Sequence, residues 1–204
     1  MIVVYHLAES RSERILWLLE ELALPYRVET YARDATGRAP EAYRRIHALG
    51  KSPVIRDGDV VLAESGAIVE YLLERHGGGR LAPSRRDELR PRFLFWLHFA
   101  EGTAMAFFVT GVVLGLTSDG GGPIGQAFQS EIQRILGYVA DELGDGPWLL
   151  GEEFTAADVM MGYVVDVAEK RGGLAEHPRL RAYVERLRER PAFVRARKAA
   201  DPGS

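Results

Sequence analysis

The sequence predicts an α/β domain followed by an all-α domain, and three features indicate this division. Residues 2–31 have the pattern of a strand, a helix and a strand, and residues 54–73 have that of a hairpin and a helix. After residue 86 no stretch has the pattern of a strand. We therefore predict a first domain at residues 1–78, a linker at 79–86 and a helical domain at 87–204.

The first domain is expected to begin with a βαβ unit. Ile2 to Leu7 is rich in β-branched residues, Ile15 to Leu24 is a strongly apolar helix that Pro25 ends, and Tyr26 to Tyr31 is a second strand. Such a unit normally has parallel strands and a right-handed crossover.

A short helix, a hairpin and another helix are expected next. The helix covers Glu41 to Ala48, Asp57-Gly58-Asp59 joins two β-branched runs, and an apolar run follows from Ser65 to Leu73. The order β-α-β-α-β-β-α, with an antiparallel pair at one end, is typical of a thioredoxin-like domain.

The second half is predicted to be helical. Three glycines at 77–79 stop the preceding helix, and Pro83 lies within the linker. Thr155 with Asp158 three residues later predicts a capping box, which we interpret as a folding element. Helices are expected at residues 87–116, 124–143, 156–171 and 178–200, the last broken at Pro191.

The composition excludes several classes of function. With 26 basic and 29 acidic residues the net charge is −3, so nucleic acid is not an expected partner. The chain has no cysteine, so it has no disulfide and no thiolate ligand or nucleophile, and any reacting thiol must arrive with a ligand. The five histidines lack ligand spacing, so no metal site is expected.

The N-terminus also lacks the features of a signal peptide. The apolar stretch Ala104 to Leu116 is shorter than the ~20 residues that a membrane span needs. We expect a cytoplasmic protein without a membrane partner.

The stretch from Leu49 to Leu72 carries the strongest indication of a ligand. Pro53 stands at the mouth of a strand, and a cis Ser52-Pro53 bond would turn the backbone N–H and C=O of Ser52 outward to pair with a peptide-like ligand. Glu64-Ser65 begins a helix, whose N-terminus favours a carboxylate, while Glu64 suits an ammonium group. An amino acid or a small peptide fits this site.

Two runs in this stretch, Leu49-Gly-Lys-Ser-Pro-Val-Ile and Ala63-Glu-Ser-Gly-Ala-Ile-Val-Glu-Tyr-Leu, resemble the glutathione-binding half of cytosolic glutathione S-transferases. Trp148 to Gly151 is similar to the run before the buried helix of that family, and the close match covers residues 49–73 and 148–159. The resemblance implies a homodimer of bacterial, Ser-utilising type. It would add the glutathione thiolate to a small apolar electrophile, as in detoxification. The alternatives are a weakly catalytic or non-catalytic binding or regulatory dimer, and a glutathione-dependent isomerase or peroxidase.

The thiol-facing group is expected where the first strand meets the first helix. Ser10 is the first candidate, because Ser- and Cys-utilising members of the family place their thiol-facing residue at this junction; Ser10 also suits a helix N-cap. Ser12 is the second candidate. Tyr5 is the third, since some classes use a strand tyrosine, although alternation along the strand can instead bury it.

The resemblance also implies binding residues. Ser52, next to Pro53, would pair with the cysteinyl backbone, Glu64 and Ser65 would hold the γ-glutamyl end, and Lys51 would lie beside the glycyl side. Further candidates are Arg11, Arg44 and His47 for the glycyl carboxylate, Glu101 for the glutathione amine of the partner subunit, and Met105, Phe108 and Tyr163 for the second-substrate pocket. Core packing would produce the same aromatic and apolar pattern as that pocket.

Overall fold

The computed structural model describes residues 1–116 and 120–201, and these group by contacts into two units. One unit contains Met1–Leu81 and the C-terminal segment from Leu187, and the other is Ala82–Arg186. The predicted helical domain at 87–204 includes that C-terminal segment, as well as 117–119 and 202–204, which lie outside the described residues. The C-terminal segment groups with the first unit because its helix packs on the first helix of the chain.

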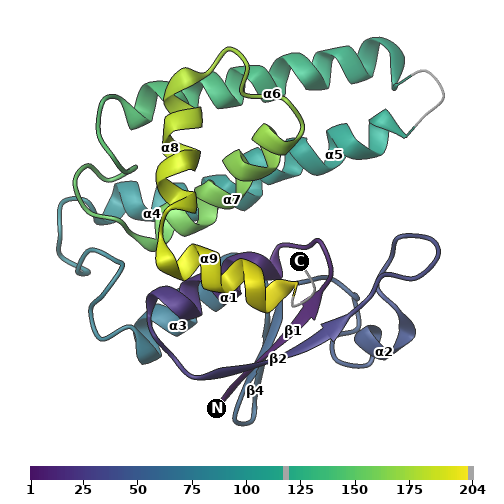
Figure 1. The fold of residues 1–204 in the computed structure, drawn as a ribbon, viewed down its shortest axis with the longest axis vertical. Coiled ribbons are helices and arrows are strands. Elements are labelled where there is room, and N and C mark those ends of the chain that lie inside the picture. Colours follow the sequence, from purple (N-terminus) through teal and green to yellow (C-terminus); the bar gives the residue numbers. More distant parts are fainter. Residues whose placement is uncertain (117–119, 202–204) are drawn as a thin grey trace. The chain divides into compact units, whose positions relative to one another are not determined.

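The first unit is built on a four-stranded mixed sheet with the order β2-β1-β3-β4 (Figure 1). Strand β1 is parallel to β2 and antiparallel to β3, and β3 pairs with β4 as a hairpin. The predicted fold class is confirmed. The elements are β1 (Ile2–Leu7), α1 (Ser12–Glu21), β2 (Tyr26–Tyr31), α2 (Glu41–Arg44), β3 (Val54–Asp57), β4 (Val60–Ala63) and α3 (Ser65–His76).

Strand β1 divides its side chains between two faces of the sheet. Tyr5, with Val3 and Leu7, joins a buried cluster that includes Tyr43 of α2. Because neighbouring residues of a strand point to opposite faces, His6 points the other way, toward α1. This alternation places an imidazole behind the start of α1.

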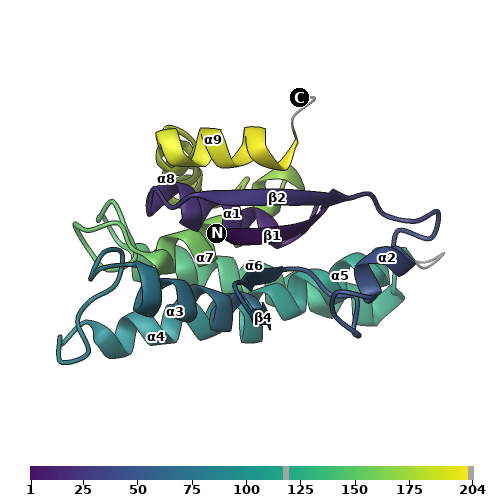
Figure 2. The same ribbon diagram turned by 90° about the horizontal axis from the view of Figure 1, so that it is seen from below.

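Helix α9 (Pro191–Ala200) completes the first unit by packing along α1, as Figure 2 shows. The rings of Trp17 and Phe193 meet edge to face with centroids 5.0 Å apart. Three arginines of this segment also pair with acidic residues of α1: Arg190 with Glu21 at 2.6 Å, Arg195 with Glu20 at 2.6 Å, and Arg197 with Glu13. Several charged pairs around one aromatic contact fix the position of α9, including its C-terminal end.

Within its described residues the second unit is helical, apart from loops and one isolated antiparallel bridge between Trp148 and Gly151. Its helices are α4 (Arg90–Phe99), the π-helix η1 (Ala100–Met105), α5 (Ala106–Gly115), α6 (Gly122–Leu143), α7 (Ala156–Lys170) and α8 (Pro178–Arg188), whose last residues belong to the first unit. By length and composition, Arg90–Gly115 is able to cross a membrane. Here α4 packs on α7 and α5 on α6.

The predicted capping box at the start of α7 is confirmed. The N–H of Thr155 donates to Oδ2 of Asp158 at 2.9 Å, and Oγ1 of Thr155 accepts from the N–H of Ala157 at 3.3 Å. Asp158 also accepts from the N–H of Leu149 and from the hydroxyl of Tyr183. Burial raises the pKa of Asp158, and these donors act in the opposite direction. The group serves folding.

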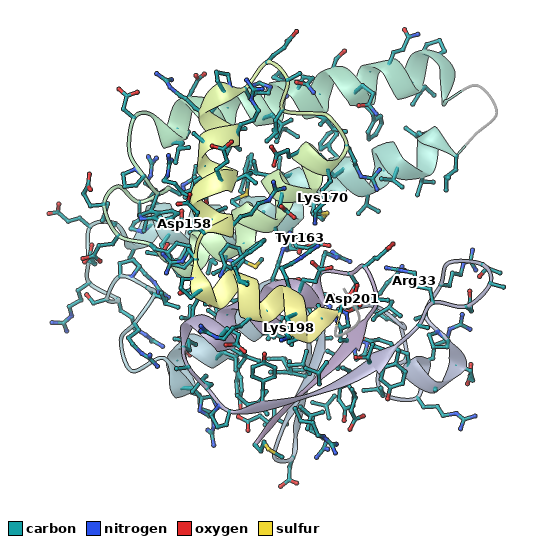
Figure 3. The ribbon with its side chains drawn as sticks, in the orientation of Figure 1. Arg33, Asp158, Tyr163, Lys170, Lys198 and Asp201 are labelled. Atoms are coloured by element: carbon teal, nitrogen blue, oxygen red, sulfur yellow. The ribbon has the colours of Figure 1, made fainter. Side chains whose placement is uncertain are left out.

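Arg33, which follows β2, holds the loop between β1 and α1 (Figure 3). Its Nε donates to the carbonyl of Ala8 at 3.0 Å, Nη2 to the carbonyl of Glu9 at 2.9 Å, and Nη1 to the carbonyl of Gly37 at 2.9 Å. Glu9 has a φ of 51°, a conformation that a residue with a Cβ seldom adopts. One side chain therefore fixes the loop that carries Ser10.

Replacing Arg33 with methionine is expected to loosen this loop. The variant keeps the apolar stem but loses three donors, which together contribute about 1 kcal/mol at an exposed site, so the amides of Glu9, Ser10 and Arg11 should exchange with solvent about fivefold faster. Hydrogen exchange followed by NMR measures this. Arg38→Met, at an exposed arginine of the neighbouring loop, is the control. Equal exchange rates in the two variants would contradict the assignment.

Candidate functional site

Three buried serines and a histidine form a continuous chain of hydrogen-bonded side chains. Oγ of Ser10 lies 2.8 Å from Oγ of Ser12 and 2.8 Å from Oγ of Ser52. Oγ of Ser12 lies 2.8 Å from Nδ1 of His6. All four side chains are buried. We name this set the serine–histidine chain; it joins β1, the following loop, α1 and the turn before β3.

The turn that carries Ser52 is tied to the sheet through Tyr43. The hydroxyl of Tyr43 donates to the carbonyl of Tyr5 at 3.1 Å and also hydrogen bonds with the side chain of Ser52. Burial raises the pKa of Tyr43, so its hydroxyl keeps its proton. The Ser52-Pro53 bond is cis, as the sequence hypothesis required.

Ser10 engages the start of α1 only weakly. Its carbonyl accepts from the N–H of Glu13 at 3.2 Å, whereas the N–H of Ser12 lies 3.4 Å from Oγ of Ser10. The N-cap position of the helix is Arg11, which makes no side-chain capping bond. The hydroxyl of Ser10 thus has its short contacts with the two other serines.

A second polar position lies at the start of α3. Glu64 is exposed and has a φ of 72°, an uncommon conformation that costs a non-glycine residue on the order of 1 kcal/mol. Ser65 is 2% exposed, and its Oγ has no hydrogen-bond partner among the described residues. A buried hydroxyl with unused bonding capacity at a helix N-terminus suits a carboxylate ligand.

The other sequence candidates in the first unit are scattered around these two positions. Lys51 and Arg44 are exposed, and Arg11 and His47 are half-buried. Tyr5 lies on the opposite face of the sheet from His6, and its hydroxyl accepts from Nε of Arg56 at 3.0 Å. The structure therefore brings together Ser10, Ser12 and Ser52 and separates the hydroxyl of Tyr5 from them.

The candidates in the second unit belong to η1 and its neighbours. Glu101 is half-buried in the π-helix, Met105 and Phe108 are buried, and Tyr163 is half-buried on α7. π-Helical segments are often found at functional sites. Within residues 1–116 and 120–201, no three potential metal-ligating side chains come together.

His6 is the residue that sequence reasoning missed. Of the five histidines, only His47 was predicted to contact a ligand, and the spacing of the five gave no indication of a metal site. The signal was present in the strand pattern, because His6 interrupts an apolar run on the face that α1 covers. Burial lowers the pKa of His6, so its imidazole is neutral near pH 7.

Comparisons with known proteins identify the family of this chain. Residues 1–74 match the family model for the glutathione S-transferase N-terminal domain, and residues 122–186 match that for the C-terminal domain. Glutathione S-transferase 3 of Schizosaccharomyces pombe is 35% identical over 98% of this chain and 89% of its own length. The Escherichia coli disulfide-bond oxidoreductase YfcG is 29% identical over 100% of this chain and 97% of its own.

Solved structures give the same result. A crystal structure of a glutathione S-transferase from Actinobacillus pleuropneumoniae has a TM-score of 0.88 and 30% identity, and covers 98% of this chain and 93% of that one. Both halves of the fold and nearly the whole sequence are thus shared with one group of proteins. The chain belongs to the glutathione S-transferase family.

Proposed function

We propose that the protein is a Ser-utilising glutathione transferase that adds the glutathione thiolate to a small apolar electrophile. The observation that carries this proposal is the position of Ser10 at the start of α1, inside the serine–histidine chain of a protein without cysteine. The names of the S. pombe and A. pleuropneumoniae relatives support the same activity. In this account the reacting sulfur belongs to glutathione.

The energetic requirement is modest. A glutathione thiol resembles that of free cysteine, whose pKa of about 8.5 leaves only ~3% thiolate at pH 7. Lowering this pKa by about two units requires ~2.7 kcal/mol of preference for the thiolate. A hydrogen bond from a hydroxyl to a charged group contributes ~1.5–3 kcal/mol, and a helix N-terminus ~0.3–1 kcal/mol. One serine beside α1 is therefore sufficient in magnitude.

The contacts favour Ser10 over the two alternatives as this donor. Ser12 is 0% exposed and is engaged with His6, whereas Ser10 is 7% exposed. The hydroxyl of Tyr5 is held by Arg56 on the other face of the sheet. Ser10 is thus the candidate hydroxyl that combines access with a position at the helix start.

We assign the glutathione contacts from the same geometry and from the family. Ser52, beside Pro53, pairs with the cysteinyl backbone, and Glu64 and Ser65 take the γ-glutamyl amine and carboxylate. For the glycyl carboxylate, the candidate partners are Lys51, Arg11, Arg44 and His47. The contributions of Glu101, Met105, Phe108 and Tyr163 stay predictions.

A second candidate function is disulfide exchange, which the similarity to YfcG favours. Because this chain has no cysteine, such an exchange would run between bound glutathione and a disulfide substrate. Isomerisation or peroxide reduction would use the same thiolate. Turnover of a general aromatic halide with no reduction of a glutathione mixed disulfide supports the transferase, and the reverse supports the oxidoreductase.

We further propose a cytoplasmic homodimer. Exposed apolar side chains on the α5 and α6 helices support an interface: Val109, Val113 and Ile124. Gel filtration should give a particle of about twice 22.7 kDa, and the dimer should be retained on immobilised glutathione. A dimer that ignores glutathione would instead indicate a binding or regulatory module.

Replacing Ser10 with alanine tests the activation step. Loss of a hydroxyl donor to the thiolate should raise the pKa of the bound thiol by about one to two units and lower the conjugation rate at pH 7 about 10- to 100-fold. The ultraviolet absorbance of the thiolate, followed against pH, measures the first effect. Ser130→Ala, at an exposed serine of α6, is the control. Unchanged thiol pKa and rate in the Ser10 variant would eliminate this assignment.

Replacing Ser65 with alanine tests ligand binding separately from folding. Since its Oγ has no partner among the described residues, its loss should leave the urea midpoint of the free protein unchanged or raised. The affinity for glutathione should fall about tenfold or more, because a hydrogen bond to a carboxylate is lost. Calorimetry measures the affinity, with Ser84→Ala in the linker as control. Equal affinities in the two variants would sink the carboxylate assignment.

A further inference from the structure

His6 has hydrogen bonds on two sides, which together fix where its proton lies. Nδ1 is 2.8 Å from Oγ of Ser12, and the ring also hydrogen bonds with the backbone of Ala200 at the end of α9. That second bond raises the pKa of His6, as a carbonyl acceptor does, so a ring N–H donates to it. Since Nδ1 faces Ser12, the donor is Nε2. Nδ1 therefore carries a lone pair and accepts the proton of Ser12.

The direction of the neighbouring hydroxyls follows from this tautomer. Ser12 donates to His6, and Ser52 donates to Tyr43, because the proton of Tyr43 is committed to the carbonyl of Tyr5. Ser10 then has two acceptors at 2.8 Å and one proton. The chain is ordered from Ser10 through Ser12 to a neutral imidazole, which is the order that a proton relay needs.

We propose that His6 accepts the thiol proton of bound glutathione through Ser12 and Ser10. The inference rests on the proposed function. The S–H bond breaks as its proton passes to Oγ of Ser10; the Ser10 proton passes to Oγ of Ser12; and the Ser12 proton passes to Nδ1 of His6. Each oxygen gains one proton and loses one, so the net products are a thiolate and an imidazolium. The hydroxyl of Ser10 then points at the thiolate.

The surroundings of His6 support a transient positive charge. The carboxylate of Asp201, directly after α9 (Figure 3), interacts electrostatically with the ring of His6 and favours the imidazolium. Ala200 ends α9, and a helix C-terminus also attracts a cation. From the other packed elements, α1 presents the neutral Ser12, and the register places Thr30 of β2 beside His6. Arg197 of α9 is paired with Glu13 of α1.

His6 is a positioning residue that also holds a proton, because it acts on the sulfur only through two serines. A purely structural imidazole would keep the hydroxyls in place and leave the thiol proton to solvent. The two accounts differ in where that proton goes when glutathione binds. This difference is measurable without any electrophile.

The experiment counts protons released against thiolate formed. Glutathione is bound to the full chain at pH 7 in two buffers of different ionisation enthalpy, and calorimetry gives the protons released. The thiolate absorbance gives the fraction ionised. S-methylglutathione, which has no thiol proton, corrects for every other group. We expect a ratio of released protons to thiolate near zero, and an imidazolium signal from His6 in nitrogen NMR with glutathione but not with S-methylglutathione.

His6→Asn supplies the matched variant, because its carbonyl oxygen can accept from Ser12 but cannot take a proton. The ratio should rise toward one and the thiolate fraction at pH 7 should fall about tenfold. His98→Asn, at an exposed histidine of α4, should behave as the wild type. A wild-type ratio near one, a His6 ring that stays neutral, or bound glutathione that stays a thiol would overturn the relay. Failure of glutathione to bind would overturn the proposed function and the relay with it.

Discussion

The buried hydrogen-bond chain from Ser52 through Ser10 and Ser12 to His6 is the constraint on which the rest of the site depends. Most buried hydroxyls and imidazoles are hydrogen-bonded, and here each of these four side chains is paired with a neighbour from a different element. These bonds tie strand β1, helix α1 and the turn before β3 to one another. Arg33 fixes the loop from outside. At the other end of the serine–histidine chain, the imidazole of His6 hydrogen bonds with the backbone of Ala200, where α9 ends.

Because the protein has no cysteine, the thiol that loses its proton in the proposed relay is that of glutathione. Transfer of a proton from a thiol of pKa about 8.5 to an imidazole of about 6.5 is uphill by ~2.7 kcal/mol, and burial of His6 adds to this. Attraction between the resulting charges, roughly 8 Å apart across three hydrogen bonds, returns ~2 kcal/mol at an effective dielectric constant of about 20. The proposed hydrogen bond from Ser10 to the thiolate would contribute a further ~1.5–3 kcal/mol. The terms are comparable, so the proposed relay would be close to thermodynamic balance.

Much of the fold was predictable because its signals are local. Strand β2 has the predicted bounds, the Asp57-Gly58-Asp59 turn forms the expected hairpin, and Thr155 forms the expected capping box with Asp158. The π-helix at Ala100–Met105 was not predicted, since its i→i+5 hydrogen bonding has no distinctive sequence pattern. Helix α9 belongs to the first unit through long-range contacts such as that between Trp17 and Phe193. A local sequence pattern does not predict such contacts.

The site residues also differ in whether local sequence patterns could predict them. Ser10, Ser52 and Ser65 were identified from turn and helix-start patterns and from a family resemblance, whereas His6 depends on which strand face α1 covers and where the chain's last helix ends. Its partner Ala200 is far away in sequence, so only the fold reveals the pairing.

The central claim is that glutathione docks beside Ser52 with its sulfur facing Ser10. The most direct measurement is a crystal structure of the complex. The account predicts the sulfur within hydrogen-bond distance of Oγ of Ser10, the cysteinyl backbone paired with Ser52, and the γ-glutamyl carboxylate on Ser65. A sulfur directed at Tyr5, or a ligand bound away from the start of α3, would contradict it.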